Sequence, residues 1–195
     1  AFANKYKNNG NVTFTYFGEG AANQGQVYET FNMASLWSLP VVFVIENNQY
    51  AMGTSMVRAS STEEMFARGV AFNIPGKAVN GMDVLEVSKE ASNAAEHCRS
   101  GKGPFILEMK TYRYRGHSMS DPAKYRTREE VQKIREEKDP IDTLRSLLIE
   151  KYKISEKEFK TIDGEIKAIV TESSDFALNS PEPDIEELWT DVYAD

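Results

Sequence analysis

Short apolar runs alternate with amphipathic segments along the first part of the chain. Three runs are rich in β-branched and aromatic residues, which is typical of strands, and two longer segments repeat their apolar residues at helical spacing. The strands are predicted at Val12–Phe17, Val41–Ile45 and Phe105–Thr111, and the helices at Asn23–Ser38 and Asp83–Ser100. Strands that alternate with helices in this way form right-handed β-α-β units and a parallel sheet. The sequence therefore predicts an α/β fold with a parallel sheet flanked by helices.

The beginning of the chain is predicted to be the end of a helix. Ala1–Tyr6 has no initiator Met, and it lacks the basic and apolar segments of a signal peptide. The helix should stop at Asn8-Asn9-Gly10, where glycine takes the left-handed conformation easily. A helix without its front indicates a fragment of a longer chain.

Polar capping motifs predict where several other helices begin. Ser61–Glu64 has the capping-box form and should open a short helix that ends near Gly69. Before that motif, Glu46–Thr54 is polar and is interpreted as a loop. Capping signals also occur at Thr127–Glu130, Asp139-Pro140 and Ser155–Glu158, and Pro181 and Pro183 precede a last short helix.

The chain changes character after a long polar loop at residues 113–126, because everything beyond it is predicted to be helical. We expect residues 1–126 to form an α/β domain with its front missing. Residues 127–195 should be a helical C-terminal extension of the same domain, packed on the sheet or on a partner chain.

Composition excludes several classes of protein. The 195 residues are 41% hydrophobic and 27% charged, as in ordinary globular domains. A net charge of −7 argues against a nucleic-acid surface. The longest apolar run, Val41–Ile45, is far too short to cross a membrane. One cysteine and two histidines argue against an internal disulfide and a zinc site, so we expect a soluble intracellular protein without membrane or nucleic-acid partners.

Three polar segments follow predicted strands, and ligands of parallel α/β sheets bind beyond the carboxyl ends of strands. These segments are Gly18-Glu19-Gly20, Glu46-Asn47-Asn48 and Gly116-His117-Ser118. If the sheet is parallel, they should meet at one rim although they lie far apart in the sequence.

The first of these segments has the parts of a phosphate site. Gly18 and Gly20 allow a sharp turn and close approach to a ligand, and the start of the following helix favours an anion. Glu19 would repel a bare phosphate but would bind a metal that bridges to it. Oxygen ligands from Glu19, Asn48 and the backbone near Tyr50 suit Mg²⁺.

Two other interpretations stay open on these residues alone. Gly18-x-Gly20 begins like a dinucleotide fingerprint, but Asn23 stands where the third glycine should fall. Alternatively, the glycines and Asn47-Asn48 are only turn residues.

Two longer motifs carry a resemblance to a known family. Gly18-Glu19-Gly20-Ala21-Ala22-Asn23-Gln24-Gly25, followed by Glu46-Asn47-Asn48, is similar to the thiamine-diphosphate signature that runs from Gly-Asp-Gly to Asn-Asn, here over 31 residues. The stretch Tyr112-Arg113-Tyr114-Arg115-Gly116-His117-Ser118-Met119-Ser120-Asp121-Pro122 resembles a loop of the α subunits of two-chain pyruvate dehydrogenase E1 components. The resemblance runs from Ala1 to about Tyr193 and implies the thiamine-diphosphate-binding α/β fold.

The resemblance implies a role for particular residues. Glu19, the side chain of Asn48 and the backbone carbonyl of Tyr50 would hold Mg²⁺. Gly18, Gly20 and Ala21 would line the diphosphate of thiamine diphosphate. His117 would reach the cofactor from its loop and is the candidate catalytic residue, since a near-neutral pKa suits proton transfer.

The family also implies an activity and partners. The implied reaction is oxidative decarboxylation of pyruvate, with the acetyl group passed to the lipoyl group of the E2 acetyltransferase. The implied assembly is an α2β2 heterotetramer in which the β subunit completes the cofactor site, so the chain alone should be inactive. Alternatives are the α subunits of acetoin or branched-chain 2-oxoacid dehydrogenase, or a non-catalytic assembly subunit whose metal site has decayed.

Two departures from the family pattern affect these expectations. Glu19 replaces the usual Asp, and its extra methylene moves the carboxylate by more than ~1 Å, so weakened Mg²⁺ affinity is expected. Ser118 and Ser55 match two serines that are phosphorylated in mitochondrial relatives, where a phosphate would add about −1.5 to −2 charge. Lys124 stands where a third serine is usual, which favours an unregulated enzyme of the bacterial cytoplasm over one of the mitochondrial matrix.

Overall fold

The computed structural model describes residues 1–193, and the chain divides into two compact units. The first unit comprises residues 1–145 and the second begins at Ser146. The proposed division at residue 126, between an α/β domain and a helical extension of it, stays a prediction.

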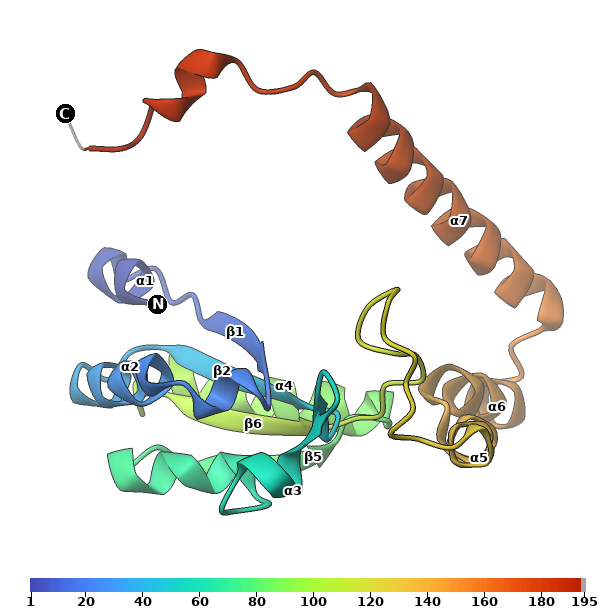
Figure 1. Ribbon diagram of the computed structural model, residues 1–195, viewed down its shortest axis with the longest axis horizontal. Coiled ribbons are helices and arrows are strands. Elements are labelled where there is room, and N and C mark those ends of the chain that lie inside the picture. Colours follow the sequence, from blue (N-terminus) through green and yellow to red (C-terminus); the bar gives the residue numbers. More distant parts are fainter. Residues whose placement is uncertain (194–195) are drawn as a thin grey trace. The chain divides into compact units, whose positions relative to one another are not determined.

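The first unit is built on a four-stranded sheet in which every neighbouring pair is parallel (Figure 1). Its strands lie in the order β1-β2-β6-β5. Their bounds are Thr13–Gly18 for β1, Val41–Asn47 for β2, Gly76–Asn80 for β5 and Phe105–Lys110 for β6. The predicted parallel α/β fold is confirmed.

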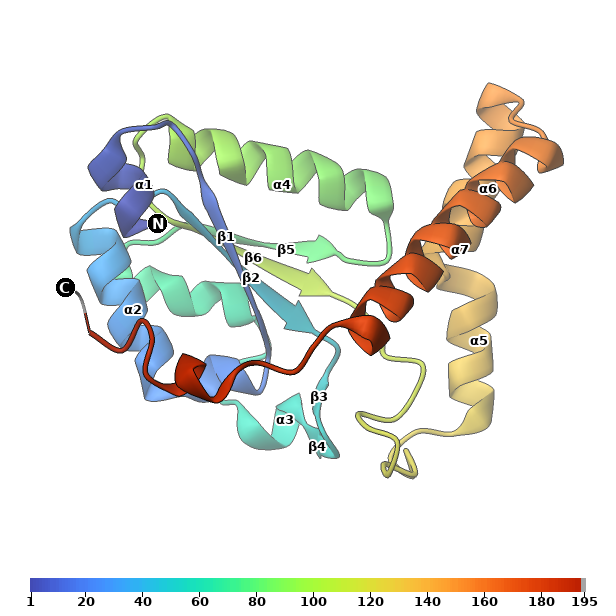
Figure 2. The same ribbon diagram turned by 90° about the horizontal axis from the view of Figure 1, so that it is seen from above.

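Helices cover both faces of this sheet, as Figure 2 shows for α2 (Gly25–Leu36) and α4 (Val84–Arg99). The reason is visible in β2, which is buried along nearly its whole length. Val41, Phe43 and Ile45 belong to the core shared with α2, whereas Val42 and Val44 belong to the core shared with α4. Side chains alternate between the faces of a strand, so an unbroken apolar run serves two cores.

The remaining elements are short, or follow the sheet along the chain. The helices are α1 (Phe2–Lys7), α3 (Met56–Ala59), α5 (Arg128–Lys138), α6 (Pro140–Tyr152) and α7 (Glu156–Asn179), with 3-10 helices at Ala21–Asn23, Met65–Phe72 and Ile185–Leu188. Two-residue strands β3 (Tyr50–Ala51) and β4 (Thr54–Ser55) pair antiparallel. No helix among residues 1–193 is long and apolar enough to cross a membrane.

Two predicted caps are confirmed, and a third cap was not predicted. The unpredicted one is Asp83, whose side chain accepts hydrogen bonds from the backbone N–H groups of Leu85 and Glu86 at the start of α4. Ser155 forms the complete reciprocal capping box with Glu158 at the start of α7. At α5 the Thr127 hydroxyl accepts from the backbone of Glu130. Each of these side chains satisfies N–H groups that a helix end leaves free.

Two local predictions are wrong, and one strand was missed. The Ser61–Glu64 box does not form: the element begins at Met65 as a 3-10 helix and ends at Phe72 rather than near Gly69. Glu46–Thr54 is not all loop, since it contains the end of β2, β3 and the start of β4. Strand β5 was not expected, because its sequence Gly-Lys-Ala-Val-Asn has no period-two pattern, and it is formed by pairing with β6.

Candidate functional site

Two of the three polar segments meet at the carboxyl ends of β1 and β2. Gly18 and Glu46 are partners in the register of these strands, which sets the turns that follow side by side. Glu19 is only 2% exposed, and its Oε2 accepts a hydrogen bond of 3.3 Å from the backbone N–H of Asn48. Within residues 1–193, the other oxygen, Oε1, is buried without a hydrogen-bond partner.

The turn at Gly18–Gly20, called the glycine turn below, packs closely against β3. A Cβ on Gly20 would lie 2.5 Å from the Cβ of Ala51, so only glycine fits there. A Cβ on Gly18 would have no neighbour within 4 Å, which leaves open space beside that residue. After the 3-10 helix, α2 begins at Gly25 without a side-chain cap. The turn is therefore open on one side and close to the β2–β3 connection on the other.

The connection from β2 to β3 is held by the side chain of Asn47. This residue is 2% exposed, and its Oδ1 accepts a 3.0 Å hydrogen bond from the backbone N–H of Gln49, which has a φ of 72°. The Oδ1 of Asn48 accepts from the backbone N–H of Tyr50 at 3.4 Å. The Asn47 amide in turn donates to Oε1 of Glu108 on β6 at 2.6 Å.

Sequence reasoning missed Glu108, which is completely buried. The signal was an acidic residue in the middle of the apolar strand Phe105–Lys110, since charged side chains are almost never fully buried unless they are paired.

The third polar segment belongs to the loop of residues 113–126, which is anchored to the same connection by two arginines. Arg113 donates to the backbone carbonyl of Tyr50 at 3.0 Å and to that of Met52 at 2.9 Å. Arg126 donates to the carbonyl of Asn48 at 3.0 Å and to the carbonyl of Arg113. The two ends of the loop are thus tied to each other and to the β2–β3 connection.

Arg126 also lies against three tyrosine rings. Its guanidinium carbon is 4.4 Å from the ring centre of Tyr112, 4.8 Å from Tyr50 and 5.5 Å from Tyr125. The rings of Tyr50 and Tyr125 stack at 4.7 Å. Burial and a hydrogen bond to Glu130 raise the pKa of Tyr112 to about 12, so this hydroxyl stays protonated beside the arginine.

Asp121 organises the tip of the loop. Its carboxylate accepts from the backbone of His117 at 2.7 Å, from the backbone of Ala123 at 2.9 Å and from the Tyr125 hydroxyl at 2.7 Å. These hydrogen bonds, the one from His117 first, lower the pKa of Asp121 to about 2. A Cβ on Gly116 would lie 2.4 Å from the Asp121 carbonyl, so the fold of the tip requires glycine.

His117 and Ser118 are exposed at this tip. Among residues 1–193, no hydrogen bond joins the His117 ring to the glycine turn, so the structure brings together the anchors of the loop and the β2–β3 connection but not the ring itself. Ser118 lies 3.1 Å from the Ser120 hydroxyl, and Ser55 is half-buried in β4. The assigned roles of His117, Ser118 and Ser55 stay predictions.

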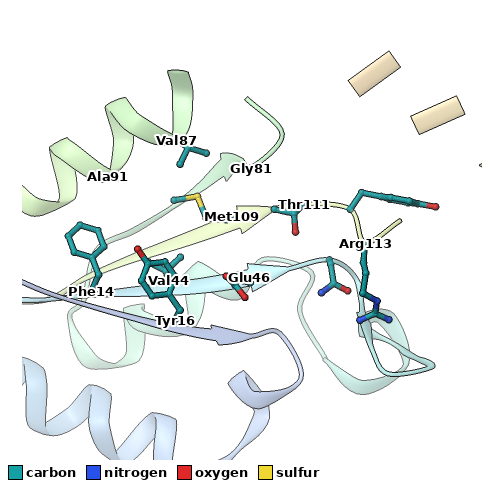
Figure 3. Close-up of a pocket in the computed structure, with 12 residues that line it drawn as sticks. Phe14, Tyr16, Val44, Glu46, Gly81, Val87, Ala91, Met109, Thr111 and Arg113 are labelled. Atoms are coloured by element: carbon teal, nitrogen blue, oxygen red, sulfur yellow. The ribbon is translucent and has the colours of Figure 1, made fainter. Parts of the chain in front are cut away.

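A cleft of about 410 Å³ opens on the α4 face of the sheet, at the same end of the strands (Figure 3). Its floor and wall are apolar, with Phe14, Val44 and Met109 from the sheet and Val87 and Ala91 from α4. Its polar end is formed by Glu46, Asn48 and Arg113. The sequence analysis did not predict this cleft, because its lining residues come from three strands, a helix and the segments that follow the strands.

The oxygen atoms at the glycine turn fit a hard divalent cation. Among residues 1–193, no group of three or more His, Cys, Asp or Glu side chains could hold a metal. Glu19 instead offers a buried oxygen that lacks a partner, beside Asn48. The Tyr50 carbonyl accepts from Arg113 but has a second lone pair. One carboxylate with amide and backbone oxygens is a donor set that suits Mg²⁺.

The fold is a parallel α/β fold, and these residues form a candidate ligand site at the carboxyl ends of its strands. The chain belongs to the Dehydrogenase E1 component family, whose profile matches residues 1–186. This confirms the family resemblance of the glycine turn and of the loop of residues 113–126.

Several curated relatives are similar along nearly the whole chain. The pyruvate dehydrogenase E1 component subunit alpha of Rhizobium meliloti (strain 1021) is 60% identical over 192 residues, which are 98% of this chain and 55% of the relative. The same subunit of Zymomonas mobilis is 55% identical over 98% of this chain and 54% of the relative. A testis-specific mitochondrial form from Rattus norvegicus is 50% identical over 99% of this chain and 49% of the relative. The chain thus spans about half the length of the curated relatives it matches.

Proposed function

We propose that this chain is part of the α subunit of a two-chain pyruvate dehydrogenase E1 component. The reaction would be the decarboxylation of pyruvate with transfer of the acetyl group to the lipoyl group of E2, whose disulfide accepts the two electrons. The names of the relatives support this assignment. The observation that carries it is the buried, unpartnered oxygen of Glu19 beside Asn48, at the carboxyl end of the sheet.

In this proposal the residues of the glycine turn bind the charged end of thiamine diphosphate. Glu19, the side chain of Asn48 and the carbonyl of Tyr50 would hold Mg²⁺. Gly18, Gly20 and Ala21 would line the diphosphate, since the space beside Gly18 is open. The uncapped start of α2 provides free N–H groups and a positive dipole end for the same anion.

When bound, thiamine diphosphate supplies the nucleophilic carbon and the electron sink that decarboxylation of a 2-oxoacid requires. The chain itself binds, orients and holds protons. His117, at the exposed tip of the loop, would orient the cofactor and hold a proton at its imidazole. Arg113 and Arg126 keep the base of that loop on the Asn48–Met52 segment, so the loop and the metal ligands form one unit.

The proposal also implies partners and a location. A β subunit would complete the cofactor site in an α2β2 heterotetramer, and E2 would receive the acetyl group. The chain should therefore show no thiamine-diphosphate-dependent turnover without a β subunit. The bacterial relatives at 60% and 55% identity, against 50% for the mitochondrial one, support a bacterial cytoplasm over a mitochondrial matrix.

Calorimetric titration with thiamine diphosphate tests this function. The full-length α subunit with its β subunit should bind the cofactor in the presence of Mg²⁺ and lose most of that binding when EDTA replaces the metal. Glu19→Gln, which removes the charge but keeps the size, should bind much more weakly. If the native assembly does not bind thiamine diphosphate, the proposal is wrong and a non-catalytic assembly subunit is favoured.

Rates with three substrates then test the specificity. Pyruvate should be turned over faster than acetoin or a branched-chain 2-oxoacid. A preference for either of the other two would assign the chain to acetoin or branched-chain 2-oxoacid dehydrogenase instead.

A further inference from the structure

A carboxylate lies fully buried in the middle of the sheet. Glu108 is 0% exposed and is paired in the register of β6 with Ile45 of β2. Its Oε1 accepts from the Asn47 amide at 2.6 Å, and its Oε2 accepts from the backbone N–H of Phe66 at 3.1 Å. Burial of a charged group costs free energy. A carboxylate at this position should therefore have a role that an apolar residue could not fill.

Its use follows from the direction of the hydrogen bonds. Both oxygens of Glu108 accept hydrogen bonds, and the NH₂ group of Asn47 is therefore turned toward Glu108. The Oδ1 of Asn47 then faces the other way, where it accepts from the backbone N–H of Gln49 at 3.0 Å. Gln49 sits in the left-handed region, with a φ of 72°, and its two neighbours are Asn48 and Tyr50.

We infer that Glu108 is a positioning residue for the candidate cation site and acts through Asn47. This inference rests on the proposed function, because it concerns the same ligands. Glu108 sets the orientation of the Asn47 amide, the amide holds the turn at Gln49, and the turn presents the Asn48 side chain and the Tyr50 carbonyl. Both oxygens of Glu108 already accept hydrogen bonds, from Asn47 and from Phe66, so Glu108 is not itself placed among the cation ligands.

The substitution Glu108→Gln changes the hydrogen bonds that residue 108 can make while keeping the size of its side chain. Glutamine has nearly the same shape but only one acceptor oxygen. If that oxygen serves Phe66, its NH₂ group faces the NH₂ group of Asn47. If Asn47 rotates to accept instead, its own NH₂ group faces the Gln49 N–H. If the glutamine oxygen instead accepts from Asn47, its NH₂ group faces the Phe66 N–H. Each of the three arrangements places two donors against each other and breaks one of these hydrogen bonds.

A second substitution allows all of these hydrogen bonds to form again. In the double variant Asn47→Asp with Glu108→Gln, the glutamine donates to the aspartate and its oxygen accepts from Phe66. The other aspartate oxygen accepts from Gln49. Net charge and size are almost unchanged, so the double variant should regain what Glu108→Gln loses.

The experiment measures Mg²⁺-dependent binding of thiamine diphosphate to the full-length α subunit with its β subunit. Glu108→Gln should weaken the apparent Mg²⁺ affinity by about 10- to 100-fold, the range observed for residues that orient metal ligands, and the double variant should restore it. The matched control is Glu90→Gln, which alters another buried carboxylate, paired with Lys77 at 2.9 Å on the α4 side. It should leave the Mg²⁺ affinity unchanged.

A second readout does not depend on the cofactor. Hydrogen exchange in peptides spanning residues 47–52 should become faster in Glu108→Gln and return to the native rate in the double variant. The exchange rates of the two variants can change in this way even if the native protein does not bind Mg²⁺ with thiamine diphosphate. In that case the proposed function fails, but the role of Glu108 in positioning the turn stands.

The inference is overturned if Glu108→Gln is folded and keeps both native Mg²⁺ affinity and native exchange, or if the double variant fails to rescue either. Should Glu108→Gln not fold, Asn47→Ala takes its place, because it leaves Glu108 its hydrogen bond to Phe66. Loss of Mg²⁺ affinity in that variant supports the inference, and native affinity refutes it.

Discussion

Arg126 ties the end of the loop of residues 113–126 to the candidate site. Its guanidinium donates to the carbonyls of Asn48 and Arg113 and lies against the rings of Tyr50 and Tyr112. Replacement by alanine removes all these contacts at once, and the two carbonyls belong to residues that are only half-buried. We therefore expect Arg126→Ala to open the loop locally without unfolding the sheet.

The size of the effect follows from the contacts. A hydrogen bond to a charged group contributes about 1.5–3 kcal/mol, and a cation–π contact at a partly exposed site contributes about 0.5–1 kcal/mol. These contacts share one side chain and do not add independently, so we expect a loss of about 3 kcal/mol for the closed loop. At 1.4 kcal/mol for each factor of ten, the open state should become about 100-fold more populated.

Hydrogen exchange in peptides that cover residues 48–52 and 113–126 measures this opening directly. Arg126→Lys should lie between the native protein and Arg126→Ala, because lysine keeps the charge but not the planar, forked geometry. Arg128→Ala, at the exposed start of α5, is the matched control and should exchange like the native protein. Unchanged exchange in Arg126→Ala would refute the reasoning.

Three further predictions concern the turn and the loop tip. Gly20→Ala brings a Cβ to within 2.5 Å of the Ala51 Cβ, so it should weaken thiamine diphosphate binding in calorimetry, whereas Gly25→Ala, which meets no neighbour within 4 Å, should not. Glu19→Asp should strengthen apparent Mg²⁺ affinity if the extra methylene misplaces the carboxylate; equal affinity contradicts that idea. Because the pKa of Asp121 is lowered from 3.8 to about 2, the stability that this carboxylate contributes is complete above pH 3.8 and is lost as the pH falls through about 2. Protection of the His117 amide against exchange should fall in that window, and Asp121→Asn should abolish this pH dependence.

The sequence by itself determined the architecture of the parallel sheet and its covering helices. The unbroken apolar run of Val41–Ile45 indicated a strand that is covered on both faces, and it packs into two cores. The capping residues Thr127 and Ser155 were identified correctly because a cap acts on N–H groups two or three residues away. The turn at Gly18–Gly20 was recognisable for the same reason, since its residues are neighbours along the chain.

Only the tertiary structure decided the contacts between distant segments. Strand β5 exists because it pairs with β6, and the residues before Met65 do not form their capping box in this setting. Neither the link from Glu108 to Asn47, 61 residues apart, nor that from Arg126 to Asn48, 78 residues apart, leaves a local pattern. Propensity, periodicity and capping act over a few residues, whereas the orientation of a buried amide or an arginine depends on donors and acceptors that folding brings together.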